Sequence, residues 1–431
     1  MKIKIIEKSY TEVLAEKQRL AELHKKHKKP KKPNIFFRTL MRLISIPDLL
    51  ATHFKSEKIG MERLGRGENC FVLMNHSSFI DLEIAATLLY PRPFNIVATT
   101  DGFIGKEWLM RQIGCIPTRK FVSDTALVRN IRHALKNQGS NVVMFPEAGY
   151  SFDGRSTVLP DSLGRCVKMM GVPLVMIRTF GAFTRDPLYN NLQRRRVKVG
   201  ARVEYLLSPE QIAEMTDGEI NDVIRAQFAF DSFMWQKENE IRVTEDFRAD
   251  GLNRILYKCP DCLAEGKTEG RGTQIKCHAC GRTHTLSELG TLEAEGGAKF
   301  DHVPDWYDWE RECVRREVES GEYRLDIPVD ILVSVDTKRL YSVGKGRLVH
   351  SKEGFTLVGE DGLSYSQKAL ASYSLNSDFN WYEIGDMISI GDNKVLYYCF
   401  PEVEGDVVAK ARLAQEEAYK LALEARLAPT V

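Results

Sequence analysis

Between about residues 65 and 207, short apolar runs alternate with stretches of helical periodicity. Five runs are patterned as strands, namely CFVLM, FNIVATT, NVVMF, VPLVMIRTF and VKVGARVEYLL. Helical patterns lie between them, near residues 80–90, 104–113, 124–138 and 161–170. Strands that are apolar along their whole length are buried on both faces, so this order predicts an α/β domain whose sheet is covered by helices on both faces.

The chain of 431 residues is too long for one hydrophobic core, and its character changes along its length. We expect a basic arm with an amphipathic helix over residues 1–60, the α/β domain over 61–245, a cysteine-rich segment over 246–292, a helical connector over 293–326 and a β-rich domain over 327–431. In the last part, short β-patterned runs precede a segment of strong helix formers, which predicts a small sandwich or open barrel capped by a helix. This order of elements is similar to that of pleckstrin-homology-like modules, and an adaptor or dimerisation domain fits it equally.

The first 60 residues carry 15 Lys and Arg against 6 Asp and Glu, whereas the remaining residues carry 46 against 53. Residues 2–23 are patterned as a charged helix, and HKKHKKPKKP follows as a solvated hinge or an electrostatic anchor. A short amphipathic helix comes next, which Pro47 is expected to interrupt. Its apolar face consists of Phe36, Phe37, Leu40, Met41 and Ile44. That face either docks on its own domain or, with the adjacent lysines, binds an anionic membrane surface.

The stretch FVLMNHSSFIDLE, residues 71–83, places Asn75 and His76 at the carboxyl end of a buried strand. Open α/β sheets bind their ligands at that edge. One interpretation is structural, because Ser78 and Asp81 fit a capping box that starts the following helix. The other is catalytic, because a carboxylate at a helix N-terminus can fix the tautomer of a neighbouring imidazole and leave its second nitrogen free to take a proton from an alcohol.

Three further blocks follow in order, GCIPTRK over residues 114–120, MFPEAGYS over 144–151 and GVPLVMI over 171–177. With these blocks, residues 60–245 resemble the phospholipid and glycerol acyltransferase family, which transfers fatty acyl groups to glycerol phosphates. The family motif NHxxxxD is matched in full by Asn75, His76 and Asp81. The other blocks are matched at Gly114, Ile116, Arg119, Phe145, Pro146, Glu147, Ser151, Val172 and Pro173.

The resemblance implies that His76 is the general base for the acceptor hydroxyl and that Asp81 orients it. Arg119 and the Glu147 loop would hold the acceptor's phosphate. The implied substrate-binding residues are Asn75, Arg119, Glu147, Gly149 and Ser151. The acyl group would come from acyl-CoA or an acyl-carrier protein, and the favoured acceptor is 1-acylglycerol 3-phosphate. Because a thioester is already activated, a positioned base is sufficient without an enzyme nucleophile.

Two features leave alternatives open. Cys70 and Cys115 flank the motif blocks, so a cysteine nucleophile is the competing mechanism, although thiols in apolar runs are usually inert. After the glutamate of the third block the family usually has Gly-Thr-Arg, whereas this chain has Ala148, Gly149 and Tyr150. A cation is therefore missing, and either Arg155 or Lys120 replaces it or the acceptor is not lysophosphatidic acid.

Two CxxC pairs separated by fourteen residues occur in CPDCLAEGKTEGRGTQIKCHAC. Cys259, Cys262, Cys277 and Cys280 are the expected ligands of a structural Zn²⁺ in a zinc ribbon, with no open coordination position. Redox chemistry is the alternative, but no thioredoxin-like βαβ pattern surrounds the pairs. Nucleic acid is not the expected partner, because this segment mixes Glu with Lys and Arg and lacks interleaved aromatic and basic residues.

No stretch approaches the roughly 18 consecutive apolar residues of a membrane span, and no secretory signal is apparent. Five of the nine cysteines are scattered, which favours a reducing compartment. We therefore expect an acyltransferase of phospholipid synthesis that is peripheral on the cytoplasmic face of an anionic membrane, with a lysophospholipid acceptor and an acyl carrier as substrates. The alternative is a non-catalytic protein that binds lipid or nucleic acid through the arm and the ribbon. The sequence specifies no oligomeric state.

Overall fold

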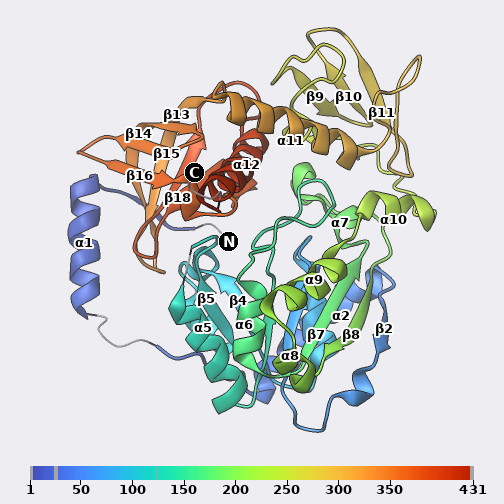
Figure 1. The fold of residues 1–431 in the computed structure, drawn as a ribbon, viewed down its shortest axis with the longest axis vertical. Helices are drawn as coiled ribbons and strands as arrows, with labels where there is room; N and C mark the ends of the chain where they lie inside the picture. The colour runs from blue at the N-terminus through green and yellow to red at the C-terminus, as the bar shows by residue number, and fades with distance from the viewer. Residues whose placement is uncertain (1–2, 24–27, 123, 428–431) are drawn as a thin grey trace.

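The computed structural model describes residues 3–23, 28–122 and 124–427. Within these ranges there is a seven-stranded sheet in the α/β domain, a four-stranded sheet in the cysteine-rich segment and an eight-stranded sheet in the β-rich domain. Figure 1 shows the last two parts above the α/β domain, with helix α11 (Val303–Ser320) running between them. The fold class expected from the sequence is confirmed.

The α/β sheet has the strand order β2-β8-β7-β3-β6-β4-β5, and neighbouring strands are parallel except β7 and β8. The strands are β2 (Lys55–Ile59), β3 (Phe71–Met74), β4 (Phe94–Thr99), β5 (Cys115–Thr118), β6 (Asn141–Met144), β7 (Leu174–Phe180) and β8 (Gly200–Leu207). Five of them match the apolar runs of the sequence. The other two were not expected, because all residues of β2 are exposed and β5 has only four residues, two of them buried.

Helices cover both faces of this sheet. On one face lie α2 (Ile35–Ala51) and α3 (Ile80–Leu89), which pack against Val72 and Met74 of β3. On the other face lie α5 (Thr125–Arg132), α6 (Leu163–Met170), α8 (Pro209–Glu214) and α9 (Asp217–Phe228), which pack against Phe71 and Leu73. Because alternate residues of a strand point to opposite faces, the four apolar residues of β3 are divided between two cores.

Helix α2 corrects one expectation, since it continues through Pro47 to Ala51. A proline inside a helix lacks the N–H that would bond to the preceding turn. Here Met41 and Leu49, on either side of the proline, pack against the same core, so tertiary packing maintains the helix across the missing bond.

The segment expected to act as one basic arm is divided between two domains. Strand β1 (Ile5–Glu7) pairs in parallel with β14, and in α1 (Tyr10–Leu23) the Tyr10 hydroxyl lies 2.7 Å from that of Tyr397 in the β-rich domain. Further along, the Lys31 carbonyl accepts a hydrogen bond from Asn95 Nδ2 at 2.7 Å, so this part of the lysine tract lies on the α/β domain. The rest of the tract, residues 24–27, lies outside the described residues.

The β-rich domain is one sheet with the strand order β16-β15-β14-β13-β19-β18-β17, antiparallel throughout this path. Its strands are β13 (Leu325–Ser334), β14 (Leu340–Ser351), β15 (Gly354–Gly359), β16 (Ser364–Lys368), β17 (Asn376–Trp381), β18 (Gly385–Gly391) and β19 (Leu396–Pro401). Helix α12 (Val408–Leu427) buries Ala411, Leu413 and Ala414 in its core. The expected β-rich domain with a capping helix is confirmed, and its likeness to pleckstrin-homology-like modules stays a prediction.

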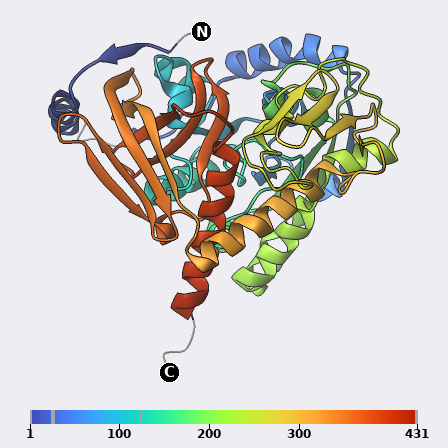
Figure 2. The same cartoon turned by 90° about the horizontal axis from the view of Figure 1, so that it is seen from above.

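Helix α11 connects the cysteine-rich segment to α12. The small sheet of that segment contains β9 (Thr268–Arg271), β10 (Gln274–Cys277), β11 (Thr283–Leu286) and β12 (Leu292–Glu293). Near it, Trp306 of α11 donates from Nε1 to the Lys258 carbonyl at 2.9 Å. Arg311 of α11 pairs with Glu416 of α12 at 2.6 Å, and Figure 2 shows the two helices crossing.

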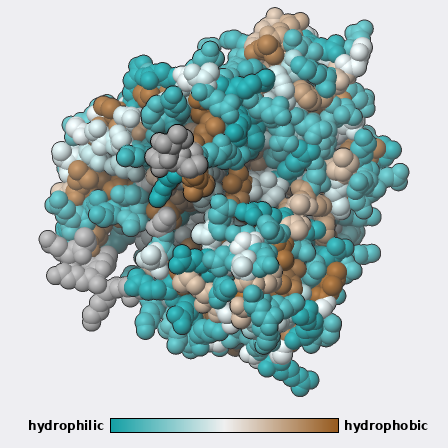
Figure 3. All heavy atoms as spheres, in the orientation of Figure 1, coloured by the Kyte–Doolittle hydropathy of each residue, from teal (hydrophilic) through white to brown (hydrophobic). Residues whose placement is uncertain are grey.

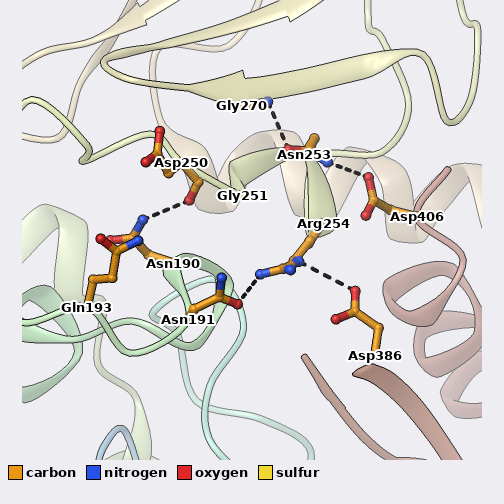
Figure 4. Close-up of a pocket in the computed structure, with 10 residues that line it drawn as sticks. All are labelled: Asn190, Asn191, Gln193, Asp250, Gly251, Asn253, Arg254, Gly270, Asp386 and Asp406. Carbon is orange, nitrogen blue, oxygen red and sulfur yellow. Dashed lines mark hydrogen bonds and ion pairs between the residues drawn. The ribbon is translucent and has the colours of Figure 1, made fainter. Parts of the chain in front are cut away.

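A small polar cavity marks the place where three parts of the chain meet (Figure 4). It has a volume of 340 Å³. Arg254 of the cysteine-rich segment bonds to Asn191 of the α/β domain and lies 3.4 Å from Asp386 of the β-rich domain. Asn253 of the same segment donates to Asp406 of the β-rich domain at 2.5 Å and also accepts from the Gly270 N–H within its own segment at 2.8 Å. The parts are therefore linked here by directional polar bonds.

Candidate active site

The first motif block lies where the sequence predicts it, directly after β3. Asn75 is held by β7, since its Oδ1 accepts from the Thr179 N–H at 2.8 Å and its Nδ2 donates to the Thr179 carbonyl at 3.3 Å. The amide thus continues the pairing of β3 with β7 by one residue. Asn75 fixes the direction in which the chain leaves the sheet toward His76.

Asp81 is fully buried in the first turn of α3 and orients the ring of His76. Its Oδ2 lies 3.1 Å from His76 Nδ1 and also accepts from the N–H groups of Ser77, at 2.7 Å, and Ser78, at 3.1 Å. Its Oδ1 accepts from the Thr179 hydroxyl at 3.2 Å. The bond from Ser78 is half of the expected capping box, so one carboxylate both starts the helix and orients the histidine.

His76 is suited to accept a proton. With Nδ1–H donated to Asp81, the free nitrogen is Nε2, and the residue lines a large cavity. Burial lowers the pKa of His76, although Asp81 acts in the opposite direction, so the ring is neutral near pH 7. Phe145 stacks on the imidazole with 4.0 Å between ring centroids, and the Tyr150 ring lies 4.4 Å away.

Residues of the third motif block form hydrogen bonds with the backbone of the first block. Glu147 is buried and accepts from the His76 N–H at 2.9 Å, the Thr157 N–H at 2.8 Å and the Ser156 hydroxyl at 3.2 Å. Burial raises its pKa to about 7. Ser151 donates its N–H to the His76 carbonyl at 3.2 Å. These two residues therefore fix the backbone of the loop that carries His76.

Ala148, the next residue of the same block, has a φ of 55°, in the left-handed region that favours glycine. The family pattern has glycine at this position.

The cavity in front of His76 has a volume of 1660 Å³ and is shared by two domains. The α/β domain contributes His76, Arg119, Lys120, Gly149 and Tyr150. The opposite side, which we call the C-terminal wall, consists of the cavity-lining residues between 370 and 382 and between 419 and 423. Among the described lining residues, Asn75, Glu147 and Ser151 do not occur, so only Arg119 and Gly149 of the five predicted substrate-binding residues reach the cavity.

The C-terminal wall is held on the third-block loop by aromatic contacts. The Arg412 guanidinium of α12 lies 4.3 Å from the centroid of the Phe152 ring, and the Phe152 and Phe379 centroids are 4.6 Å apart. On the face of the molecule that Figure 3 shows, apolar atoms gather near the middle, where Figure 1 places α12 above the α/β domain. Sequence reasoning missed this wall, because its residues lie far from the motif blocks and carry no motif.

The structure distinguishes the two candidates for the missing cation. Arg155 forms ion pairs with Asp231 at 2.7 Å, Asp305 at 2.7 Å and Asp308 at 2.5 Å. It is not among the described residues that line the cavity. Lys120 lines the cavity, and no carboxylate of the described ranges lies within ion-pair distance of it. Arg119 bonds to the Asn393 carbonyl of the β-rich domain, and its buried Nε lacks a partner in the described part of the chain.

Neither candidate cysteine nucleophile is activated. Cys70 and Cys115 are both buried, and burial raises the pKa of each thiol to about 12. A thiol in this state is not a nucleophile near neutral pH.

The four cysteines of the CxxC pairs lie together, with all four sulfur atoms within 4.8 Å of one another. Cys259 and Cys280 are 3.8 Å apart, and Cys262 and Cys277 are 3.7 Å apart. Four sulfurs at about 2.3 Å from a central Zn²⁺ would be separated by about 3.8 Å in a regular tetrahedron. The arrangement therefore fits a tetrahedral metal ion with no open position.

The family comparison agrees with the motif blocks. Residues 55–179 match the acyltransferase family model. Among solved structures, the chain is similar to the 1-acyl-sn-glycerophosphate (LPA) acyltransferase PlsC from Thermotoga maritima, with 17% sequence identity and a TM-score of 0.37. That match covers 44% of this chain and 78% of the bacterial one.

Proposed function

Residues 55–179 form a domain of the acyltransferase family, and we propose that the chain transfers a fatty acyl group from acyl-CoA or an acyl-carrier protein to the hydroxyl of a lysophospholipid-type acceptor. The observation that carries the proposal is the pair of His76 and Asp81 at the cavity. The sequence favours 1-acylglycerol 3-phosphate as the acceptor, and Arg119 and Lys120 of the second motif block line the cavity and would bind its phosphate.

The reaction needs one positioned base. His76 Nε2 takes the proton of the acceptor hydroxyl while the oxygen attacks the thioester carbonyl. Asp81 holds the tautomer and stabilises the imidazolium that forms. When the tetrahedral intermediate collapses, the C–S bond breaks, and the proton on His76 passes to the leaving thiolate. The acyl ester and a free thiol are the products, and the histidine is again neutral.

Helix α2 supports a site on an anionic membrane surface. Phe36, Leu43 and Ile44 are 66%, 56% and 64% exposed, while Ser45 and Leu49 face the domain. Exposed lysines precede the helix at positions 28, 29, 31 and 32. Apolar side chains beside basic ones are the combination that binds anionic lipid. None of the described helices combines the length and the apolar composition that a membrane-spanning helix needs.

The same surface leads to the cavity. Trp108 of helix α4 (Glu107–Gln112) is 68% exposed and packs edge-on against Phe37 of α2, with 6.2 Å between centroids. Met110 of α4 lines the cavity, as does Phe79, which is exposed just before α3. A lipid acceptor taken from a membrane in contact with α2 and α4 would therefore enter the cavity directly from that surface.

The cysteine cluster completes the proposal. Cys259, Cys262, Cys277 and Cys280 would hold one structural Zn²⁺, because four thiolates saturate a tetrahedral shell. The ion would stabilise a segment too small for a core of its own.

The test is an acyl-transfer assay with the full chain, a panel of lysophospholipids and both CoA and carrier-protein thioesters. We expect activity with the unmodified chain and a loss of about 100-fold or more in His76→Ala, with the melting temperature unchanged. The matched control is His133→Ala, which removes the same side chain outside the cavity and should keep full activity. Absence of activity in the unmodified chain, or its survival in His76→Ala, would contradict the proposal.

A further inference from the structure

One aspartate of the cavity is neither bonded to another side chain of the described ranges nor used as a helix cap. Among the described residues, the aspartates that line it are Asp101, Asp124, Asp161 and Asp378. Asp101 accepts from Trp381 Nε1 at 3.3 Å. Asp124 caps α5 through the Ala126 N–H at 2.8 Å, and Asp161 pairs with Arg225 at 2.7 Å. Asp378 neither forms an ion pair nor caps a helix within the described ranges, and its carboxylate accepts a hydrogen bond from the backbone N–H of Phe379.

Asp378 lies on β17 in the C-terminal wall, and Lys120 of the α/β domain lines the same cavity within electrostatic reach of it. Burial raises the pKa of Asp378 to about 6, and the charge of Lys120 acts in the opposite direction. Lys120 also acts on His76, whose pKa it lowers, and Asp378 on Tyr150, whose pKa it raises. The cavity therefore places the positive charge of Lys120 within electrostatic reach of His76, and the negative charge of Asp378 within reach of Tyr150, whose ring contacts His76.

The charges of Lys120 and Asp378 together fit a ligand that carries a positive group as well as a phosphate. Tyr150 occupies the position where the family usually has an arginine, so a positive charge is absent and Asp378 adds a negative one. Partly buried charges of opposite sign are complementary to a ligand that carries both charges. A phosphate monoester, with two negative charges, would be attracted by Lys120 and repelled by Asp378.

We propose, on the basis of the acyltransferase function above, that the acceptor is a lysophospholipid with a zwitterionic head group, bound with its phosphate beside Lys120 and its ammonium beside Asp378. Four aromatic residues share the C-terminal wall of the cavity with Asp378, namely Tyr373, Phe379, Trp381 and Tyr382. Carboxylates and aromatic faces are the groups that bind an ammonium. Because Asp378 lies outside the matched residues 55–179, this specificity would be a contribution of the C-terminal domain.

The experiment compares four acceptors with the same acyl chain: lysophosphatidylethanolamine, lysophosphatidylcholine, lysophosphatidylglycerol and lysophosphatidic acid. We expect kcat/KM for the better of the two ammonium lipids to exceed that for lysophosphatidylglycerol by about tenfold or more, as for loss of a charged hydrogen bond. The first two acceptors distinguish a primary from a quaternary ammonium. In Asp378→Asn the ratio should fall toward one, through KM rather than kcat.

The matched control is Asp161→Asn, which makes the same chemical change at a cavity aspartate paired with Arg225 and should keep the preference. Two results would overturn the inference and leave the acyltransferase function standing. One is an equal kcat/KM for lysophosphatidylglycerol and the ammonium lipids, and the other is a preference for the ammonium lipids that survives Asp378→Asn. A strong preference for lysophosphatidic acid would do the same. Only absence of transfer to all four acceptors, with either donor, would overturn the function as well.

Discussion

The Glu147 carboxylate accepts a hydrogen bond from the backbone N–H of His76, with 2.9 Å between oxygen and nitrogen. The resemblance of the third block implied that this glutamate belongs to the phosphate-binding loop, yet its other bonds go to Ser156 and Thr157. The structure therefore favours a positioning role, in which Glu147 fixes the backbone from which the imidazole of His76 extends.

Glu147→Gln tests that role. The glutamine oxygen can replace the carboxylate oxygen that accepts from Ser156 and Thr157, but the amide nitrogen then faces the His76 N–H, and two donors cannot bond. We expect the free energy of unfolding to fall by about 1–3 kcal/mol and kcat to fall more than KM for the acceptor changes. Ser156→Ala, which leaves the bond to His76 intact, is the control and should lose less. A change confined to the acceptor KM would instead place Glu147 at the phosphate.

The same variant has a pH signature. Because burial raises the pKa of Glu147 from 4.5 to about 7, the folded protein binds more protons than the unfolded chain between these values. The contribution of Glu147 to stability is thus full below about pH 4.5 and is lost as pH rises through about 7, by about 1.4 kcal/mol per pH unit between. Denaturant titrations should therefore show the stability difference between the unmodified chain and Glu147→Gln decreasing over this range. A constant difference would show that Glu147 does not titrate there.

Asp81→Asn separates the charge of Asp81 from its geometry. Oδ2 accepts three N–H bonds, and Oδ1 faces a threonine hydroxyl that can also accept. An asparagine can therefore place its oxygen at the Oδ2 position and donate to Thr179, which keeps the His76 tautomer and removes only the negative charge. We expect kcat to fall by about 10- to 100-fold in Asp81→Asn, and by more in Asp81→Ala, which loses the orientation as well. Equal losses would show that orientation contributes nothing beyond charge.

Much of the catalytic domain was predictable because its signals are local. The apolar run of β3, the helix of Asp81 and the motif blocks each occupy a few neighbouring residues, and the fold brings them together as expected. The fate of Arg155 was not predictable, because the aspartates that engage it lie in α11 and before α10 (Ser232–Glu238). The same is true of Asp378, whose importance depends on which surface of the β-rich domain covers the cavity.

The exposed apolar face of α2 predicts salt-sensitive binding to anionic vesicles. Leu43→Glu combined with Ile44→Glu adds two negative charges to that face, and we expect sedimentation with anionic vesicles to fall by about tenfold or more. Binding of the unmodified chain should also weaken as salt rises, since the lysine contribution is screened. Val358→Glu makes the same kind of substitution, with one negative charge, at an exposed apolar residue of the β-rich domain, and this variant should bind normally. If the α2 variant still sediments, or binds RNA but never vesicles, the membrane surface is wrongly assigned.

Loss of the proposed zinc ion should affect the C-terminal wall of the cavity through helices α11 and α12. The ribbon residue Lys258 donates its N–H to Glu310 of α11 at 2.7 Å and accepts from Trp306. Arg311, one residue further, pairs with Glu416 and Glu417 of α12, the helix that supplies part of the C-terminal wall. We expect one Zn²⁺ per chain by elemental analysis and its loss in Cys277→Ser, which removes one of the four thiolates. The bonds to α11 should weaken as a result, because the segment has little core of its own and depends on the ion for its fold. Hydrogen exchange in α11 and α12 should then accelerate, and the acceptor KM should rise. Cys166→Ser, in α6, is the control and should keep both the metal and the exchange pattern. If the metal is lost while exchange in α12 stays unchanged, the ribbon does not support the cavity wall.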